Sequence, residues 1–420
     1  MRRLYTALLL LLLPAATLLV WWRGLRERNY WRGWRQRFGR GYPQLPRSIW
    51  IHAVSMGEVQ AALPLLERLR RQYPQHRLLI TSATPAGRER ARQVNPDAAV
   101  CYAPYDYPAA IRRVLRATRP SALVILETEI WPNLLHECAS AELPVLFASA
   151  RMSARTLRRL RRFGGLVPVQ SLHTAQVAAQ SDADAARFRE LGLPASHIRV
   201  SGNLKFDRVP APEQRARGAA LRQHYAGDRR VWVAGSTHAG EEEAALAAHR
   251  RLRHGELLVL APRHAPRFGE VATLLADHGV NYQRRSAAVT EARADAGVEV
   301  LLLDTLGELG DFYAAADLAF VGGTLVPVGG HNLLEPAALG VATLCGPHLF
   351  NAPDIARALH GQGGLRIVPD ADGLAQAVAE LMVDDEARRR LGAAGSAVVE
   401  ANRGALQRVS QQLDEMLDRR

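Results

Sequence analysis

The sequence predicts an α/β protein with two domains, each built on a parallel sheet covered by helices, preceded by an apolar N-terminal helix. Three observations lead to this prediction. The chain has 420 residues, which is long for a single hydrophobic core. Short apolar runs rich in β-branched residues alternate with helical stretches, and this rhythm stops and restarts near the middle of the chain. A charge-free segment of 19 residues, 4–22, lies near the start.

Residues 1–40 are assigned to a membrane anchor followed by a basic and aromatic interfacial segment. As a helix, 4–22 would extend about 28 Å, close to the thickness of a bilayer core. A cleaved signal peptide and a helix buried in a domain core are the alternatives, but the segment is long for a signal core and has no small-x-small site. We therefore expect a single-pass anchor.

The basic segment after the anchor predicts which side of the membrane the remaining chain occupies. Between positions 23 and 40 lie seven arginines, one glutamate and several aromatic residues, a composition that suits anionic lipid head groups. The positive-inside rule then places the catalytic portion in the cytoplasm. The net charge of +13 would also suit a nucleic-acid partner, but this cluster adjoins the anchor, so we expect no nucleic acid.

The first α/β domain is assigned to 41–206, the linker to 207–217 and the second domain to 218–420. Strands of the first domain are predicted at 48–54, 77–83, 98–104, 122–127, 144–150 and 198–202. Strands of the second are predicted at 231–235, 257–262, 298–304, 318–322, 343–346 and 366–369. Two such Rossmann-like halves facing a central cleft form the GT-B architecture of glycosyltransferases. Ligands bind beyond the carboxyl ends of such strands.

Candidate catalytic residues follow strands of the first domain. Glu58 opens a helix, where a carboxylate could take a proton from a substrate hydroxyl or simply favour the helix N-terminus. Glu127 and Glu129 follow the fourth strand and are expected to point to opposite sides, with Glu129 preferred for the site. Trp131 is either a wall of a sugar site or plain packing. Lys205 is the only lysine in the chain, so either a compact ammonium is needed there or a solvated lysine persists by chance.

Candidate nucleotide-binding residues follow strands of the second domain. Arg263 is placed to pair with a phosphate, and His264 is interpreted as a hydrogen-bonding group. The loop 305–309 allows a base or ribose to approach the backbone, or is an ordinary glycine-containing turn.

A glycine-rich segment, 322–336, carries the densest signal in the second domain. Its two glycine pairs free backbone N–H groups to face an anion, and a helix beginning near Asn332 would add its dipole. Glu335 could accept hydrogen bonds from ribose hydroxyls. No Asp-x-Asp pair ends a strand, no set of His, Asp and Glu has metal-ligand spacing, and the three cysteines have no CxxC spacing, so we expect neither a metal nor another cofactor.

The motifs resemble those of the 3-deoxy-D-manno-octulosonic acid (Kdo) transferases of lipopolysaccharide synthesis. The matching stretches span both domains: 52–58 (HAVSMGE), 127–133 (ETEIWPN), 202–207 (GNLKFD), 261–264 (APRH), 304–309 (DTLGEL) and 329–336 (GGHNLLEP). Met56 stands where the family often has valine, a difference expected to affect only packing.

The resemblance implies inverting transfer of Kdo from CMP-Kdo to a lipid A precursor, lipid IVA, at the bacterial inner membrane. It implies that Glu58 is the catalytic base and that Glu129 and Lys205 stabilise the transition state. It implies CMP contacts at Pro262, Arg263, Gly307, Glu308, Leu309, Asn332, Leu333, Leu334 and Glu335. The expected partners are therefore CMP-Kdo, a lipid A precursor and anionic membrane lipid.

Three alternatives to this function remain open. Another GT-B enzyme that uses a UDP-sugar, such as a lipid A disaccharide synthase, should lack the ETEIWPN and GNLKFD segments. A sugar-nucleotide epimerase of the same fold would have no reason to carry a membrane anchor. A non-catalytic nucleotide-binding membrane protein makes no demand on Glu58.

Overall fold

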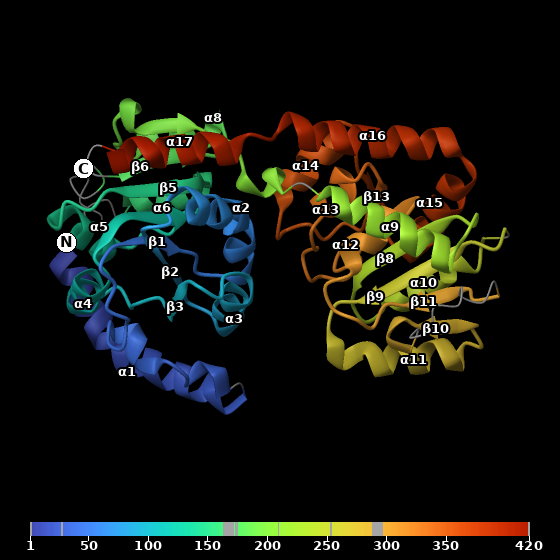
Figure 1. Cartoon of the computed structure of the whole chain (residues 1–420), viewed down its shortest axis with the longest axis horizontal. Helices are drawn as coiled ribbons and strands as arrows, with labels where there is room; N and C mark the ends of the chain where they lie inside the picture. Colours follow the sequence, from blue (N-terminus) through green and yellow to red (C-terminus); the bar gives the residue numbers. More distant parts are fainter. Residues whose placement is uncertain are drawn as a thin grey trace. The chain divides into compact units, whose positions relative to one another are not determined.

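The chain forms two compact units, Met1–Arg208 with Asn402–Arg420, and Val209–Ala401 (Figure 1). The structure, a computed structural model, describes residues 2–26, 28–162, 172, 175–208, 210–252, 254–287 and 297–418. Each unit contains its own seven-stranded sheet in which neighbouring strands run parallel. The GT-B-like prediction of two Rossmann-like sheets is thereby confirmed.

The sheet of the first unit has the order β3-β2-β1-β4-β5-β6-β7. Its strands are β1 (Ser48–His52), β2 (Arg77–Ser82), β3 (Ala99–Tyr102), β4 (Pro120–Leu126), β5 (Val145–Ala150), β6 (Ala175–Ala179) and β7 (Ile198–Val200). Its described helices include α2 (Met56–Gln72), α3 (Pro85–Val94), α4 (Pro108–Thr118), α5 (Pro132–Ser140), α6 (Ala154–Arg162), α8 (Asp182–Glu190) and α17 (Ala405–Asp418). Strand β6 was not predicted.

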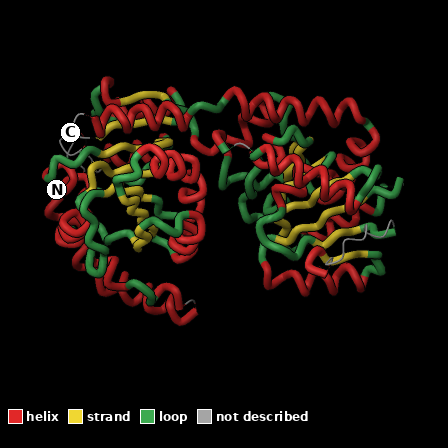
Figure 2. The backbone as a smooth tube through the Cα atoms, viewed as in Figure 1, coloured by secondary structure: helices red, strands yellow, loops and turns green. Residues whose placement is uncertain are grey.

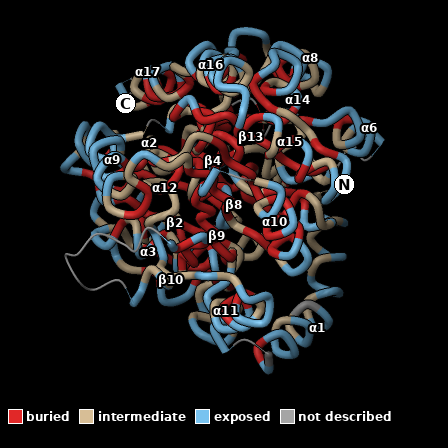
Figure 3. The backbone as a smooth tube through the Cα atoms, turned by 90° about the vertical axis from the view of Figure 1, so that its right-hand side faces the viewer, coloured by how far each residue is buried: buried red, intermediate tan, exposed pale blue. Residues whose placement is uncertain are grey.

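Both faces of this sheet are covered, which explains its continuous apolar strands. All five residues of β1 are buried. Trp50 belongs to the core on one face, whereas its neighbours Ile49 and Ile51 belong to the core on the other, as strand alternation requires. Buried residues accordingly concentrate on the strands and on the helix faces turned towards them (Figure 3).

The sheet of the second unit has the order β10-β11-β9-β8-β12-β13-β14. Its strands are β8 (Val231–Thr237), β9 (Leu257–Pro262), β10 (Tyr282–Arg284), β11 (Val300–Leu302), β12 (Leu318–Val321), β13 (Ala342–Cys345) and β14 (Arg366–Ile367). Its described helices are α9 (Pro212–Tyr225), α10 (Glu241–His249), α11 (Phe268–Asp277), α12 (Leu309–Ala315), α13 (Leu334–Ala338), α14 (Pro353–Gly361), α15 (Ala371–Val383) and α16 (Asp385–Ala401). Helices flank the strands of this sheet too (Figure 2).

The predicted domain boundaries differ from the observed units at two places. Helix α9 begins at Pro212, inside the segment expected to be a linker, because a proline at the first helical position starts a helix well. Helix α17, expected in the second domain, packs in the first unit, where Val409 and Leu413 join the core beneath β1. The last helix therefore returns to complete the N-terminal unit.

One N-terminal helix, α1 (Arg2–Arg26), is long and apolar enough to cross a membrane by length and composition. It is followed by the short helices η1 (Arg28–Tyr30) and η2 (Trp34–Phe38), which complete the basic and aromatic segment. The segment is not loose, because Tyr102 at the end of β3 donates a hydrogen bond from its hydroxyl to the carbonyl of Asn29 at 2.8 Å and another from its backbone N–H to Gln36 Oε1 at 3.0 Å.

Candidate active site

Three carboxylates gather at the carboxyl ends of two neighbouring strands in the first unit. Strand β1 pairs with β2 on one side and β4 on the other, so the strand order reverses between β1 and β4. Such a reversal is where open α/β sheets bind ligands. Glu58 follows β1, and Glu127 and Glu129 follow β4. Both of these carboxylates act electrostatically on Glu58.

Glu58 is held firmly at the start of helix α2. Ser55 caps the helix by accepting the backbone N–H of Glu58 at 3.2 Å. In return, Glu58 Oε2 accepts the backbone N–H of Val54 at 2.8 Å, and Oε1 accepts the Ser55 hydroxyl at 2.9 Å. Each carboxylate oxygen has a further lone pair, so these bonds orient the group without saturating it.

Burial is the main reason why the pKa of Glu58 is unusual. The residue is only 7% exposed. Desolvation above all, with a smaller contribution from the charges of Glu127 and Glu129, raises its pKa from an ordinary 4.5 to about 7 against the lowering effect of the Val54 and Ser55 hydrogen bonds. A carboxyl group poised near neutrality is well matched to general-base work.

Strand alternation does not support the prediction that Glu127 and Glu129 point to opposite sides, because residues two positions apart in a strand lie on the same face. Strand β4 ends at Leu126, and Glu127 has a left-handed φ of 54°, so the backbone leaves the extended conformation at Glu127 itself. The two carboxylates interact with each other as well as with Glu58: burial, followed by the charge of Glu127, raises the pKa of Glu129. The strained φ of Glu127 is typical of functional sites.

Lys205 pairs with Glu127. Glu129, the carboxylate preferred for the site from the sequence, is not its partner. The Nζ to Oε1 distance is 2.8 Å, and both side chains are about one-third exposed. Lys205 lies in the short helix η4 (Leu204–Asp207), whose final carboxylate, Asp207, accepts the backbone N–H groups of Gly404 and Leu406 at 2.6 and 2.7 Å. The start of α17 therefore fixes the lysine segment.

Trp131 and Glu129 form a second pair. The indole Nε1 of Trp131 donates to Glu129 Oε2 at 2.8 Å, and its ring meets the edge of the buried His52 at 4.7 Å between centroids. Trp131 thus packs within the unit and also orients a carboxylate. Trp131 therefore has a packing role and also lies next to the candidate site.

In the second unit, the backbone N–H groups at the first glycine pair do not face a phosphate as expected. Those of Gly323 and the two residues after it bind a carboxylate of the protein itself, that of Glu241. Glu241 is 0% exposed and opens helix α10. Its carboxylate accepts the backbone N–H groups of Gly323 at 2.7 Å, Thr324 at 3.0 Å and Leu325 at 2.9 Å, together with that of His238 at 2.9 Å. The anion that these N–H groups face is therefore the protein's own.

A basic side chain, Arg263, lies close to the backbone N–H groups that Glu241 binds. Arg263 follows β9 and makes no ion pair with any of the described residues. Two imidazoles meet nearby, with His238 Nε2 and His331 Nε2 2.8 Å apart, and His264 lies 5.4 Å from His238 between ring centroids. Burial, followed by the charge of Arg263, lowers the pKa of His331 to about 4. The guanidinium of Arg263, beside a His331 that stays neutral, favours an anionic ligand over a cation.

The remaining predicted CMP contacts frame the same edge of the second sheet. Helix α13 begins at Leu334 and has five residues, so it starts later than predicted and its dipole is short; Asn332 Oδ1 accepts the Leu334 N–H at 3.2 Å. The charge of Glu335 acts on the buried Tyr313 of α12, the helix that begins at Leu309. Loop 307–309 and residue 335 are thereby linked through one tyrosine.

The predicted contacts differ in what their side chains offer a ligand. Pro262, Leu333 and Leu334 are buried. The carboxylate of Glu308 is engaged by Arg285 at 2.7 Å and by Thr305. Gly307 has a φ of 92°, a backbone conformation that favours glycine. The loop can therefore offer backbone groups, whereas Arg263, Asn332 and Glu335 offer side chains.

Two features of the candidate site were missed from sequence. Glu241 was included in a predicted helix without a role, although three consecutive glutamates at a helix start signal N-terminal acidic residues. The pairing of Lys205 with Glu127 crosses 78 positions of sequence and had no local signal. Among the described residues, no cluster of three or more His, Cys, Asp or Glu side chains could hold a metal ion.

Comparison with solved structures supports the fold. UDP-GlcNAc 2-epimerase from Neisseria meningitidis matches 88% of this chain and 100% of its own, with a TM-score of 0.59 and 11% sequence identity. At that identity the likeness concerns the fold alone.

Comparison with sequences identifies the family. The family described as 3-Deoxy-D-manno-octulosonic-acid transferase (kdotransferase) matches residues 32–208. The 3-deoxy-D-manno-octulosonic acid transferase of Haemophilus influenzae is 37% identical over 100% of this chain and 99% of its own. The enzyme of the same description from Bordetella pertussis is 36% identical over 99% of both chains. With such similarity over its whole length, the chain belongs to the 3-deoxy-D-manno-octulosonic acid transferase family.

Proposed function

We propose that this Kdo transferase takes Kdo from CMP-Kdo and attaches it to a hydroxyl of a lipid A precursor, lipid IVA, with inversion of the anomeric carbon. The observation that carries the proposal is the buried Glu58 carboxyl, whose pKa is raised to about 7 beside two further carboxylates. Family membership supports the transferred sugar. The motifs shared with the family support the donor and the acceptor.

In the proposed reaction Glu58 removes the proton of the acceptor hydroxyl. The acceptor oxygen forms a bond to the anomeric carbon of Kdo as the bond from that carbon to the phosphate oxygen breaks, and CMP departs with the electron pair. One displacement with one base and no covalent intermediate inverts the carbon centre. In the oxocarbenium-like transition state, Glu129 stabilises the positive charge of the sugar and Lys205, positioned by its 2.8 Å contact to Glu127, the negative charge that grows on the departing phosphate.

The second unit is proposed to hold CMP. Arg263 pairs with the phosphate, since its guanidinium lies at a strand end and has no carboxylate partner within the described part of the chain, which leaves it available to a ligand oxyanion. The loop around Gly307 accommodates the nucleoside, and Glu335 accepts from ribose hydroxyls. Pro262, Glu308, Leu309, Leu333 and Leu334 shape the pocket around these groups.

The pH dependence of transfer tests the proposed base. Because Glu58 must be ionised to accept a proton, kcat/KM for the wild-type protein should fall about tenfold for each pH unit below an apparent pKa near 7. Initial rates with CMP-Kdo and a lipid A precursor between pH 5 and 9 measure it. A profile that stays flat down to pH 5 would remove Glu58 from this role.

A second prediction concerns Lys205. Replacing it by methionine should lower kcat at saturating CMP-Kdo by about 100-fold and change KM little, because the ammonium acts on charge that develops in the transition state. Arg199→Met is a matched control, since Arg199 forms an exposed ion pair with Glu415 at 2.7 Å. A Lys205→Met enzyme with the kcat of the control would return Lys205 to an ordinary solvated lysine.

Transfer is also proposed to need no divalent metal and to occur at the cytoplasmic face of the bacterial inner membrane. The reaction rate should therefore survive EDTA. Helix α1 and the arginine-rich segment provide the attachment, since ten large apolar side chains of α1 are exposed and must meet lipid or another apolar surface: Leu4, Leu8, Leu10, Leu11, Leu12, Leu18, Leu19, Trp21, Trp22 and Leu25. A lipid acceptor explains why an enzyme of this kind should stay in the membrane plane.

A further inference from the structure

Helix α1 is fastened to the first unit at its N-terminal end. Arg2 and Thr6 both donate to Asn133 Oδ1 at 3.1 Å. The hydroxyl of Tyr5 donates to Asp106 Oδ2 at 3.0 Å. From the other side, the hydroxyl of Tyr107 donates to the backbone carbonyl of Leu9 at 2.8 Å. Together these side chains bind the first two turns of the helix to the loop that precedes α4 and to the first turn of α5.

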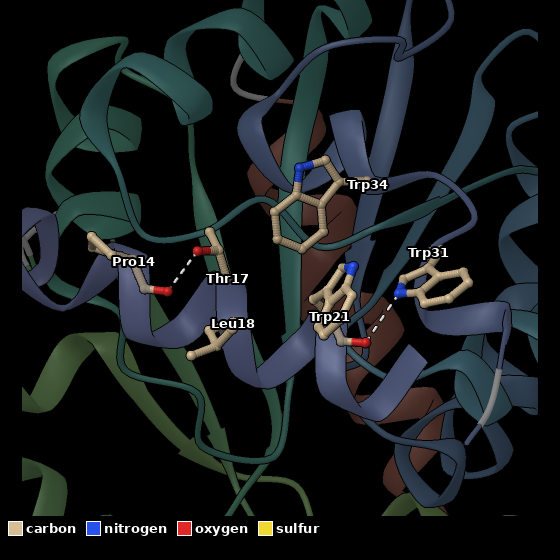
Figure 4. Close-up of a pocket in the computed structure, with 6 residues that line it drawn as sticks. All are labelled: Pro14, Thr17, Leu18, Trp21, Trp31 and Trp34. Atoms are coloured by element: carbon tan, nitrogen blue, oxygen red, sulfur yellow. Dashed lines mark hydrogen bonds between the residues drawn. The ribbon is translucent and has the colours of Figure 1, made fainter. Parts of the chain in front are cut away.

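The C-terminal end of α1 is fastened to the same unit. Trp31 donates from its indole to the backbone carbonyl of Trp21 at 3.1 Å (Figure 4). The indole lies so close to the helix that a Cβ on Gly24 would fall 1.9 Å from Trp31 Nε1. The residues that follow are bound to the end of β3, where the guanidinium of Arg37 lies 4.2 Å from the centre of the Tyr102 ring.

One face of α1 is less exposed than the other. Residues with reduced exposure recur every three or four positions, which is one stripe of a helix, and they are Arg2, Tyr5, Thr6, Leu9, Leu13, Thr17, Val20 and Gly24. The stripe contains the two threonines and the tyrosine of the helix. The opposite face carries exposed leucines, of which Leu11 is 77% exposed.

These contacts do not fit a helix that crosses the membrane. Twenty-five residues of α-helix are about 37 Å long, which exceeds the roughly 30 Å of a bilayer core. A crossing helix would carry Arg2 and Tyr5 to the far side, away from Asn133 and Asp106. We infer that α1 lies along the membrane surface, with its exposed leucine face immersed in lipid and its less exposed stripe on the side of the first unit, in place of the single crossing that its composition predicts.

An apolar pocket beside the helix fits contact with lipid hydrocarbon. It has a volume of about 660 Å³ and is lined by Pro14, Thr17, Leu18, Trp21, Trp31 and Trp34 (Figure 4). Indoles suit the boundary between head groups and acyl chains. The arginines that follow the helix, Arg28, Arg32 and Arg35 among them, supply charge for anionic head groups.

The docked helix also reaches the catalytic loop. Asn133, which receives Arg2 and Thr6, ends the same ETEIWPN segment that carries Glu127 and Glu129. A helix lying flat at this edge holds that segment at the membrane surface, where a lipid acceptor presents its sugar hydroxyls. The inference rests on the proposed attachment to a membrane and adds how the protein meets it.

Cysteine labelling of the full-length protein decides the orientation of α1. The three natural cysteines are buried, so a membrane-impermeant maleimide should report only introduced thiols. Arg3→Cys marks the exposed N-terminal end of α1, and Asp97→Cys marks an exposed position on the first unit. Each variant is labelled in inverted inner-membrane vesicles, which expose the cytoplasmic face, and in spheroplasts, which expose the other.

A flat helix puts both thiols on one side, so both should react in inverted vesicles and neither in spheroplasts. Reaction of Arg3→Cys in spheroplasts, with Asp97→Cys still reacting only in inverted vesicles, would overturn the inference and leave the attachment intact. Recovery of the protein in the soluble fraction would instead overturn the attachment itself.

The docking contacts can be removed without making the helix more polar. The double variant Tyr5→Phe and Thr6→Val loses two of the hydrogen bonds, and adding it to Arg3→Cys should move a measurable fraction of the labelling to spheroplasts. An unchanged pattern would overturn the assignment of the holding role to these two side chains.

Discussion

Replacing Glu58 by glutamine should reduce transfer by about 10²- to 10⁴-fold, the usual contribution of a general base, while the protein becomes more stable above neutral pH. Glutamine keeps the shape of the side chain and a carbonyl oxygen that can accept the Val54 N–H, but it cannot take up a proton. The loss should lie in kcat, because the replaced group acts on the acceptor proton during the chemical step.

The gain in stability follows from the direction of the pKa change. The pKa of Glu58 is raised in the folded state, so the favourable contribution of the protonated carboxyl is present below pH 4.5 and is lost as the pH rises towards 7. Since each pKa unit corresponds to about 1.4 kcal/mol, the ionised group costs roughly 3 kcal/mol above pH 7 relative to a neutral isostere. Glu58→Gln avoids this cost.

Urea unfolding at pH 8 and pH 4 measures this effect alongside the transfer rate. The Glu58→Gln protein should have the higher free energy of unfolding at pH 8 and nearly the wild-type value at pH 4. Glu67→Gln is a matched control, because Glu67 is an exposed residue of the same helix, and it should change neither quantity. An inactive Glu58→Gln protein that is also less stable at pH 8 would indicate a structural role for the carboxylate.

Replacing Glu241 by alanine should cause the largest loss of stability. Four buried or partly buried backbone N–H groups donate to this carboxylate at distances between 2.7 and 3.0 Å. A buried donor left without a partner costs about 1–3 kcal/mol, so the second unit should lose about 4 kcal/mol or more. The loop that contains Gly323 and Thr324 would also lose its shape, and CMP binding should weaken with it.

Glu243→Ala provides the matched control for this prediction. Glu243 lies in the same helix start, is exposed, and accepts one N–H, that of Gly240 at 3.1 Å. Its loss should cost about 1 kcal/mol, as for an ordinary helix cap. Urea unfolding of the full-length variants distinguishes the two positions, and equal costs for Glu241→Ala and Glu243→Ala would contradict the role assigned to the buried carboxylate.

The fold and the first carboxylate were predictable because their signals are local. Continuous apolar strands alternating with helices predicted both parallel sheets, and a Ser-x-x-Glu after a strand predicted where Glu58 would lie. The position of this carboxylate at the carboxyl end of a strand can be predicted without knowing which distant residues surround it. Its raised pKa was not predictable, since it depends on burial and on the charges of Glu127 and Glu129.

The errors arose where distant residues or backbone conformation decide the outcome. Glu129 was preferred because it lies nearer the loop, whereas the carboxylate that pairs with Lys205 is that of Glu127. Glu241, 82 positions away in sequence, accepts the backbone N–H of Gly323, where a phosphate was expected. Helix α17 joined the first unit because Asp207 caps its start from 199 positions away, a contact with no trace in local composition.

Mass spectrometry of the product formed by the purified full-length protein from CMP-Kdo and lipid IVA tests the proposed function most directly. We expect the mass of the lipid to increase by one or more whole Kdo residues, the reaction to proceed in EDTA, and no product to form when UDP-sugars replace CMP-Kdo. An unchanged lipid mass with CMP-Kdo, or a hexosamine added from a UDP-sugar, would contradict the assignment of donor and acceptor.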